Sequence, residues 1–236
     1  MANKIKLSKK LKNVTIIQGF PGFGLVGTIA TEYLIEHLKC ELIANYWFEE
    51  LPATITVHGG KMSFPIAIYY NKEYNLIILH SILSTSGLEW KIGELIQDIA
   101  TQTKAKEIIS LEGVSSPQDN GEPKAYYFSN NGTSEKKLQG VADLLQEGII
   151  IGVTSALFIK NKTKITSFFA DTHSQLPDSK AAAKLITVLD KYLDLEIDPK
   201  PLLETAKKFE EKIKALLEKG LETQEEMKKK QLNYVG

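Results

Sequence analysis

Residues 14–27 read VTIIQGFPGFGLVG, a β-branched run that passes directly into a glycine-rich turn. The run at 14–18 predicts a short buried strand. After the turn, apolar residues recur at helical spacing to about residue 39, which predicts a helix. A strand, a glycine turn and a helix in this order form the first half of a βα unit, so we expect an α/β fold.

The rest of the chain up to residue 196 continues this alternation. Apolar runs predict strands over 41–47, 54–58, 61–70, 75–82, 107–114, 125–129, 149–153 and 165–171, and Gly59-Gly60 predicts a hairpin between the second and third of these. Helical spacing predicts helices over 87–103, 134–147 and 177–193. This order argues for one core domain, residues 1–196, built on a mixed, mainly parallel sheet with helices on both faces.

The C-terminal part differs in character. A long charged helix is predicted over 197–230, and its apolar residues alternate in steps of four and three. That spacing is typical of a coiled-coil seam, so docking on another chain and packing on its own domain are both open. The positions that would carry an oligomer interface are Leu202, Phe209, Ile213 and Leu216. Residues 231–236 are expected to form a flexible tail.

Composition limits the classes of function. The chain has 29 basic and 29 acidic residues, so no global field favours nucleic acid. Every basic residue is Lys, which removes the bidentate guanidinium clamp of many phosphate sites. Cys40 is the one cysteine, which rules out a disulfide within the chain. No signal-peptide core and no apolar run of membrane-span length is present, and we expect a cytoplasmic protein.

The glycine turn matches a dinucleotide fingerprint, with glycines at 22, 24 and 27 after a strand and before a helix. Pro21 stiffens the turn, Phe20 and Phe23 crowd it, and the acidic residue that should follow the fingerprint is not clearly placed. We therefore favour a structural turn that displays Phe20 and Phe23 to a partner, with no cofactor. A nucleotide-binding regulator that uses this loop is the weaker alternative.

Residues 19–27, GFPGFGLVG, resemble the opening signature of the proteasome assembly chaperone family. Two later segments agree. LEGV at 111–114 is similar to the end of a central strand in that family, and LPDSKAA at 176–182 resembles its late helix start. The family often has a second Pro where this chain has Ser179. The resemblance covers residues 14–195.

The resemblance implies a fold like that of nucleoside phosphorylases, without their chemistry. Family members are homo- or hetero-oligomeric, ATP-independent chaperones of archaeal and other origin. They hold proteasome α subunits, the core particle or unfolded clients. On this basis we expect a non-enzymatic homo-oligomer that binds such partners and needs no cofactor.

Archaeal members of the family can dock on the core particle through a hydrophobic-Tyr-x tail. This chain departs from that pattern, because Tyr234 is third from the end and Asn233 precedes it. The candidate docking residues are Leu232, Tyr234, Val235 and Gly236. A variant docking mode and a frayed end without a partner both stay open.

The rival hypothesis is an enzyme, a nucleoside phosphorylase or hydrolase on the same fold. Glu112, Asp171 and His173 follow or end predicted strands, where the sites of α/β proteins gather. The simpler interpretation, which we prefer, is that the two acids cap neighbouring loops and the histidine lies on the surface.

Overall fold

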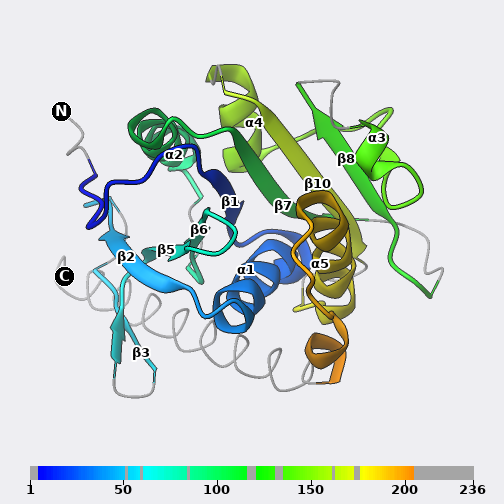
Figure 1. Cartoon of the computed structure of the whole chain (residues 1–236), viewed down its shortest axis with the longest axis horizontal. Helices are drawn as coiled ribbons and strands as arrows, with labels where there is room; N and C mark the ends of the chain where they lie inside the picture. Colours follow the sequence, from blue (N-terminus) through cyan, green and yellow to red (C-terminus); the bar gives the residue numbers. More distant parts are fainter. Residues whose placement is uncertain are drawn as a thin grey trace, which may run out of the picture.

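The computed structural model describes residues 5–50, 53–58, 61–83, 86–115, 121–130, 135–160, 163–172 and 176–204. Its centre is one eight-stranded sheet in the order β2-β5-β6-β1-β7-β10-β8-β9 (Figure 1). Helices cover both faces of this sheet. The predicted mixed α/β architecture is therefore confirmed.

Four parallel strands form the middle of the sheet: β6 (Leu76–His80), β1 (Thr15–Gly19), β7 (Glu107–Ser115) and β10 (Ile165–Thr172). Antiparallel pairs flank them. On one side β5 (Ile66–Asn71) pairs with β6, and β2 (Glu41–Tyr46) pairs with β5. On the other side β8 (Ala125–Ser129) runs antiparallel to β10, and the short β9 (Asp143–Leu144) then pairs with β8 in parallel.

Two helical layers explain why the central strands are apolar along their whole length. α1 (Val26–His37) and α5 (Ser179–Leu193) cover one face, and α2 (Glu89–Thr103) and α4 (Gly152–Lys160) cover the other. In β1, Ile17 points into the α1–α5 layer and Ile16 into the α2–α4 layer, and both are fully buried. A strand buried on both faces needs no polar alternation.

The segment predicted as one strand over 61–70 is divided in the structure. β3 (Thr56–His58) and β4 (Lys61–Ser63) pair with each other in a separate two-stranded sheet, and β5 joins the main sheet only from Ile66. Figure 1 shows this hairpin projecting away from the main sheet. Pro65 lies at the break, where a proline cannot donate a ladder hydrogen bond.

The helix predicted over 134–147 and the strand predicted over 149–153 are wrong. The described part of the first segment holds only a short helix, α3 (Glu135–Leu138), and β9. The three isoleucines at 149–151 have high β propensity, but they form a loop before α4. Gly152 has a φ of +79°, a left-handed conformation that breaks an extended run before α4 begins.

The start of the C-terminal segment is anchored to the core. Tyr33 Oη donates to the carbonyl of Asp198 at 2.8 Å, and the backbone is helical over 200–204. Leu202 is 0% exposed within the α1–α5 layer, so this position of the predicted seam packs on its own chain. Phe209, Ile213 and Leu216 lie outside the described residues, as does the tail. None of the helices in the described ranges is long and apolar enough to cross a membrane.

Candidate functional site

The topology creates a crevice between the carboxyl ends of β1 and β7. After β1 the chain moves to β2 at one edge of the sheet, and after β7 it moves to β8 on the opposite side. Neighbouring strands whose connections leave in opposite directions define a switch point, where α/β sheets commonly bind ligands. A cleft of about 500 Å³ opens at this point, and we call it the switch-point cleft.

Aromatic and aliphatic side chains make up most of the cleft wall. Phe20 and Phe23 come from the turn after β1, and Phe169 comes from β10. Ile149, Ile150 and Ile151 line the side next to α4. Two carboxyl groups also line the cleft, Glu112 on β7 and Glu89 in the first turn of α2. The volume falls in the range of small-molecule sites.

Glu112 is held by a polar network beneath the cleft. Gln18 on β1 is the register partner of Ser110 on β7, and Gln18 Nε2 donates to the Ser110 hydroxyl. Thr154 Oγ1 on α4 accepts a second hydrogen bond from Gln18 Nε2 at 3.2 Å, and it contacts the Ser110 hydroxyl. Thr154 and Ser110 both donate to Glu112 Oε1, at 2.5 and 3.4 Å. Hydroxyl groups from β7 and α4 therefore hold one oxygen of this carboxyl group, and Gln18 on β1 in turn holds both hydroxyl groups.

The second oxygen of Glu112 faces the turn after β1. A Cβ added at Gly22 would lie 3.5 Å from Glu112 Oε2. Desolvation by burial raises the pKa of Glu112 to about 7, although the hydrogen bonds from Thr154, Ser110 and Gln18 act in the opposite direction. Near neutral pH the carboxyl group can therefore exist in either protonation state.

The mouth of the cleft is apolar and exposed. We define its rim as Phe23, Ile149 and Ile151, which are 42%, 92% and 67% exposed. Phe20, predicted with Phe23 as a contact residue, is only 5% exposed and packs into the α2–α4 layer. Of the two phenylalanines, Phe23 is therefore the one that a partner can reach directly.

The glycine turn packs α1 closely against the sheet. A Cβ at Gly27 would lie 2.3 Å from the carbonyl oxygen of Leu111, and Gly24 has a φ of +60° with Thr172 Oγ1 only 2.5 Å from its added Cβ. Such distances cannot be tolerated, so the structure supports a structural role for these two glycines. Gly22 differs, because its added Cβ would make only an ordinary contact. We therefore expect Gly24 and Gly27 to resist substitution, whereas Gly22 is free of this steric limit.

The proposed acid/base group is not brought together among the described residues. Glu112 lines the cleft, whereas Asp171 accepts a 3.5 Å hydrogen bond from Tyr126 Oη on β8. In the β7–β10 register Asp171 stands opposite Val114. His173 lies outside the described residues.

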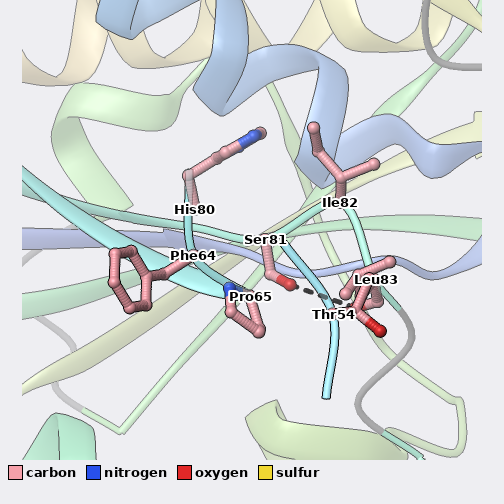
Figure 2. Close-up of a pocket in the computed structure, with 7 residues that line it drawn as sticks. All are labelled: Thr54, Phe64, Pro65, His80, Ser81, Ile82 and Leu83. Atoms are coloured by element: carbon pink, nitrogen blue, oxygen red, sulfur yellow. Dashed lines mark hydrogen bonds between the residues drawn. The ribbon is translucent and has the colours of Figure 1, made fainter. Parts of the chain in front are cut away.

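A second, much smaller cavity of about 10 Å³ lies at the end of β6 (Figure 2). Figure 2 shows the ring of His80 directed towards α1. There Thr31 Oγ1 lies 2.9 Å from Nδ1, and Glu32 Oε2 lies 3.1 Å from Nε2. A cavity of this volume has room for about one water molecule and is too small for a larger ligand. Because its ring contacts two residues of α1, we assign His80 a role in joining β6 to α1.

Several residues of the site were not identified from sequence. Gln18 and Ser110 interrupt apolar strands, and a polar residue within a strand buried on both faces was an available signal. The role of three further residues was missed because the segment around 149–153 was predicted as a strand, whereas it forms a loop and the start of α4: Ile149, Ile151 and Thr154. No pattern in the sequence pairs Thr154 with Glu112, because 42 positions separate them.

The fold and cleft together define an α/β protein with an apolar cleft at the carboxyl ends of its parallel strands. The family model described as the PAC2 family matches residues 16–217, and the chain belongs to this family. The resemblance found in the sequence is thereby confirmed. An uncharacterised protein of Methanocaldococcus jannaschii is 25% identical over 242 residues, with 100% of both chains covered.

Solved structures agree with this assignment. PbaA of Pyrococcus furiosus, described as an archaeal homolog of proteasome-assembly chaperone, is 26% identical with a TM-score of 0.81, over 92% of this chain and 97% of its own. A Thermoplasma acidophilum protein of unknown function is 23% identical with a TM-score of 0.83, over 94% and 93% of the two chains. Pyrococcus furiosus PbaB, an archaeal proteasome activator, has the same fold at 23% identity, with a TM-score of 0.74 over 89% and 97%.

Proposed function

We propose that this protein is an ATP-independent, proteasome assembly chaperone-like protein that binds proteasome subunits or the core particle. The observation that carries the proposal is membership of the PAC2 family across residues 16–217, together with the full-length likeness to PbaA. The proposal extends to holding partly unfolded client proteins, since a chaperone of this kind works by presenting apolar surface.

The rim supplies a surface of the required kind. Large apolar side chains at high exposure, grouped around a concave site, are typical of protein-binding surfaces. Ile149 and Ile151 lie in the loop directly before α4 and are the most accessible members of the rim. The tail residues Leu232 and Tyr234 remain a second proposed contact, with the free carboxylate giving direction to the peptide.

The decisive experiment is a pull-down of archaeal proteasome core particle and free α subunits with the full-length protein. Replacing Ile149 and Ile151 by Lys should lower recovery at least tenfold, because each change puts a charge into an apolar contact. Ile159→Lys is the matched control, since Ile159 is 71% exposed on the last turn of α4 and does not line the cleft. Failure of the unmodified protein to recover either partner would contradict the proposal.

A parallel variant separates the tail from the rim. Deletion of Tyr234, Val235 and Gly236 should weaken binding to the assembled core particle and leave binding to free α subunits unchanged. If that deletion abolishes docking, removing Val235 alone places Tyr234 in the penultimate position and should tighten it. Unchanged docking after the triple deletion would remove the tail from the mechanism.

A further inference from the structure

The floor of the switch-point cleft holds a carboxyl group, Glu112, in one fixed orientation, which a surface that only docks proteins does not need. The two hydroxyls that donate to Glu112 Oε1 occupy its lone pairs, so the carboxyl proton, when present, belongs on Oε2. Oε2 is the oxygen that faces Gly22, which has no side chain to place between this oxygen and the cleft. The protein thus holds one hydrogen-bond donor in a fixed direction at a concave, largely apolar site.

We propose that the switch-point cleft binds a small, uncharged, planar molecule whose carbonyl oxygen or ring nitrogen accepts a hydrogen bond from the protonated Glu112 Oε2. The ring would lie against the aromatic side chains of Phe23 and Phe169. The inference does not rest on the proteasome-directed function proposed above, although Phe23 belongs both to the rim and to this site.

The charges around the cleft select the class of ligand. Both charged side chains among the described lining residues, Glu89 and Glu112, are carboxyls. Glu89 Oε1 accepts a 3.0 Å hydrogen bond from the backbone N–H of Gly87, which holds this second carboxyl group at the cleft wall. The negative charge of Glu89, joined by that of Glu112 when Glu112 is ionised, opposes a phosphate or carboxylate in the same space. The geometry therefore favours a neutral ring over an anionic one.

The protonation state of Glu112 gives binding a defined pH dependence. The groups that face this carboxyl group are Gln18 on β1, Ser110 on β7 and Thr154 on α4, none of which is ionisable in this range, and Glu89 on α2 shares the cleft. The pKa of Glu112 is about 7, so the O–H donor is present at pH 6 and largely lost at pH 8.5. An acceptor ligand should bind roughly 30-fold more weakly at the higher pH.

The test uses three neutral rings as probes: benzamide, nicotinamide and 2-pyridone. Benzoate is the comparator, because it keeps the shape of benzamide and replaces the neutral group by an anion. Each is titrated into the full-length protein at pH 6 and pH 8.5, up to about 10 mM, by ligand-observed NMR and calorimetry. We expect a Kd on the order of 1 mM for at least one neutral probe at pH 6, as is usual for ligands of this size.

Two variants locate the binding. Glu112→Gln keeps an oxygen for the Ser110 and Thr154 hydroxyls and puts an N–H donor in the place of Oε2, so affinity should persist and lose its pH dependence. Gly22→Ala places a methyl group 3.5 Å from Oε2 and should weaken binding about tenfold. Gly148→Ala is its matched control, because the added Cβ there also meets neighbours at 3.5 Å and Gly148 does not line the cleft.

Each outcome of these titrations either supports the proposed ligand site or overturns it. Binding of a neutral probe that weakens with pH, fails for benzoate and becomes pH-independent in Glu112→Gln supports the site. Absence of binding by all three neutral probes, equal affinity for benzoate and benzamide, or an unchanged affinity in Gly22→Ala overturns it. The result is read without proteasome components, so it is distinguishable from failure of the chaperone-like function.

Discussion

At the scale of single residues, two acids on neighbouring strands differ because their surroundings differ. Glu112 lies over a network of hydroxyl and amide groups and loses hydration, which raises its pKa to about 7. On β10 the register partner of Glu112 is Phe169. Asp171, two positions further along β10, accepts a hydrogen bond from Tyr126. Glu112 is thus poised for titration near neutral pH.

The raised pKa of Glu112 predicts how stability changes with pH. The folded state holds this proton more tightly than the unfolded chain, so the free energy of unfolding is greatest below about pH 4.5 and falls as pH rises to about 7. Above pH 7 this contribution is fully lost. Glu112→Gln should remove the decline and leave the variant more stable at pH 8 by up to about 3 kcal/mol.

Urea denaturation of both proteins at pH 5, 6, 7 and 8 measures this difference. The curves should lie closest together at pH 5 and separate progressively above it. Parallel pH profiles for the two proteins would show that Glu112 titrates as in the unfolded chain.

At the scale of elements, α5 shows how one side chain can join a helix start to the sheet. Asp178 is the N-cap of α5, where Oδ1 accepts from the Ala181 N–H at 3.0 Å. Its Oδ2 accepts from Thr172 Oγ1 at 2.8 Å, and its own N–H donates to the carbonyl of Gly24 at 2.9 Å. The cap therefore connects α5, the end of β10 and the glycine turn.

Loss of this cap should destabilise the protein measurably. Asp178→Ala removes an acceptor from the first turn of α5 and from a buried Thr172 hydroxyl, with an expected cost of about 1–3 kcal/mol in the free energy of unfolding. Asp178→Asn retains a capping oxygen and should lose less. Asp143→Ala, at an exposed position of β9, serves as the control and should change stability by less than about 0.5 kcal/mol. An alanine variant as stable as the control would contradict the role assigned to the cap.

At the scale of the whole molecule, the chain presents its apolar rim at the same edge of the sheet that carries the cleft. The C-terminal segment leaves from the other helical layer, where Leu202 is buried beside α1 and α5. With Leu202 inside its own chain, a seam between chains would have to begin further along, at Phe209 or beyond.

We predict that the protein is an oligomer held in part by Phe209, Ile213 and Leu216. Replacing Phe209 and Ile213 by Lys should lower the mass measured by light scattering, because burying such a side chain contributes on the order of 1.5–3 kcal/mol. Glu210→Lys adds the same net charge of two from a position outside the seam, and its mass should stay that of the unmodified protein. A folded double variant of unchanged mass would show that this segment is not an interface between subunits.

The sequence by itself determined the class of fold and the family. Residues 14–27 identified β1, the glycine turn and α1, and the Pro177-Asp178 signal identified the start of α5. These predictions succeeded because local periodicity, turn chemistry and capping act within a few residues of each other. The same local reasoning failed at 134–153, where the β propensity of three isoleucines was overridden by the glycine break and by the packing of α4 on α2.

Only the tertiary structure decided what surrounds Glu112. The network is made by Gln18 on β1, Ser110 on β7 and Thr154 on α4, and its assembly beside the Glu112 carboxyl group depends on strand order and on how α4 packs. Burial is likewise a property of the assembled fold, which is why Phe20 and Leu202 are enclosed while Phe23 and Ile149 are exposed. A carboxyl group acquires a shifted pKa from distant segments that exclude water around it, and the spacing of residues along a chain does not specify that environment.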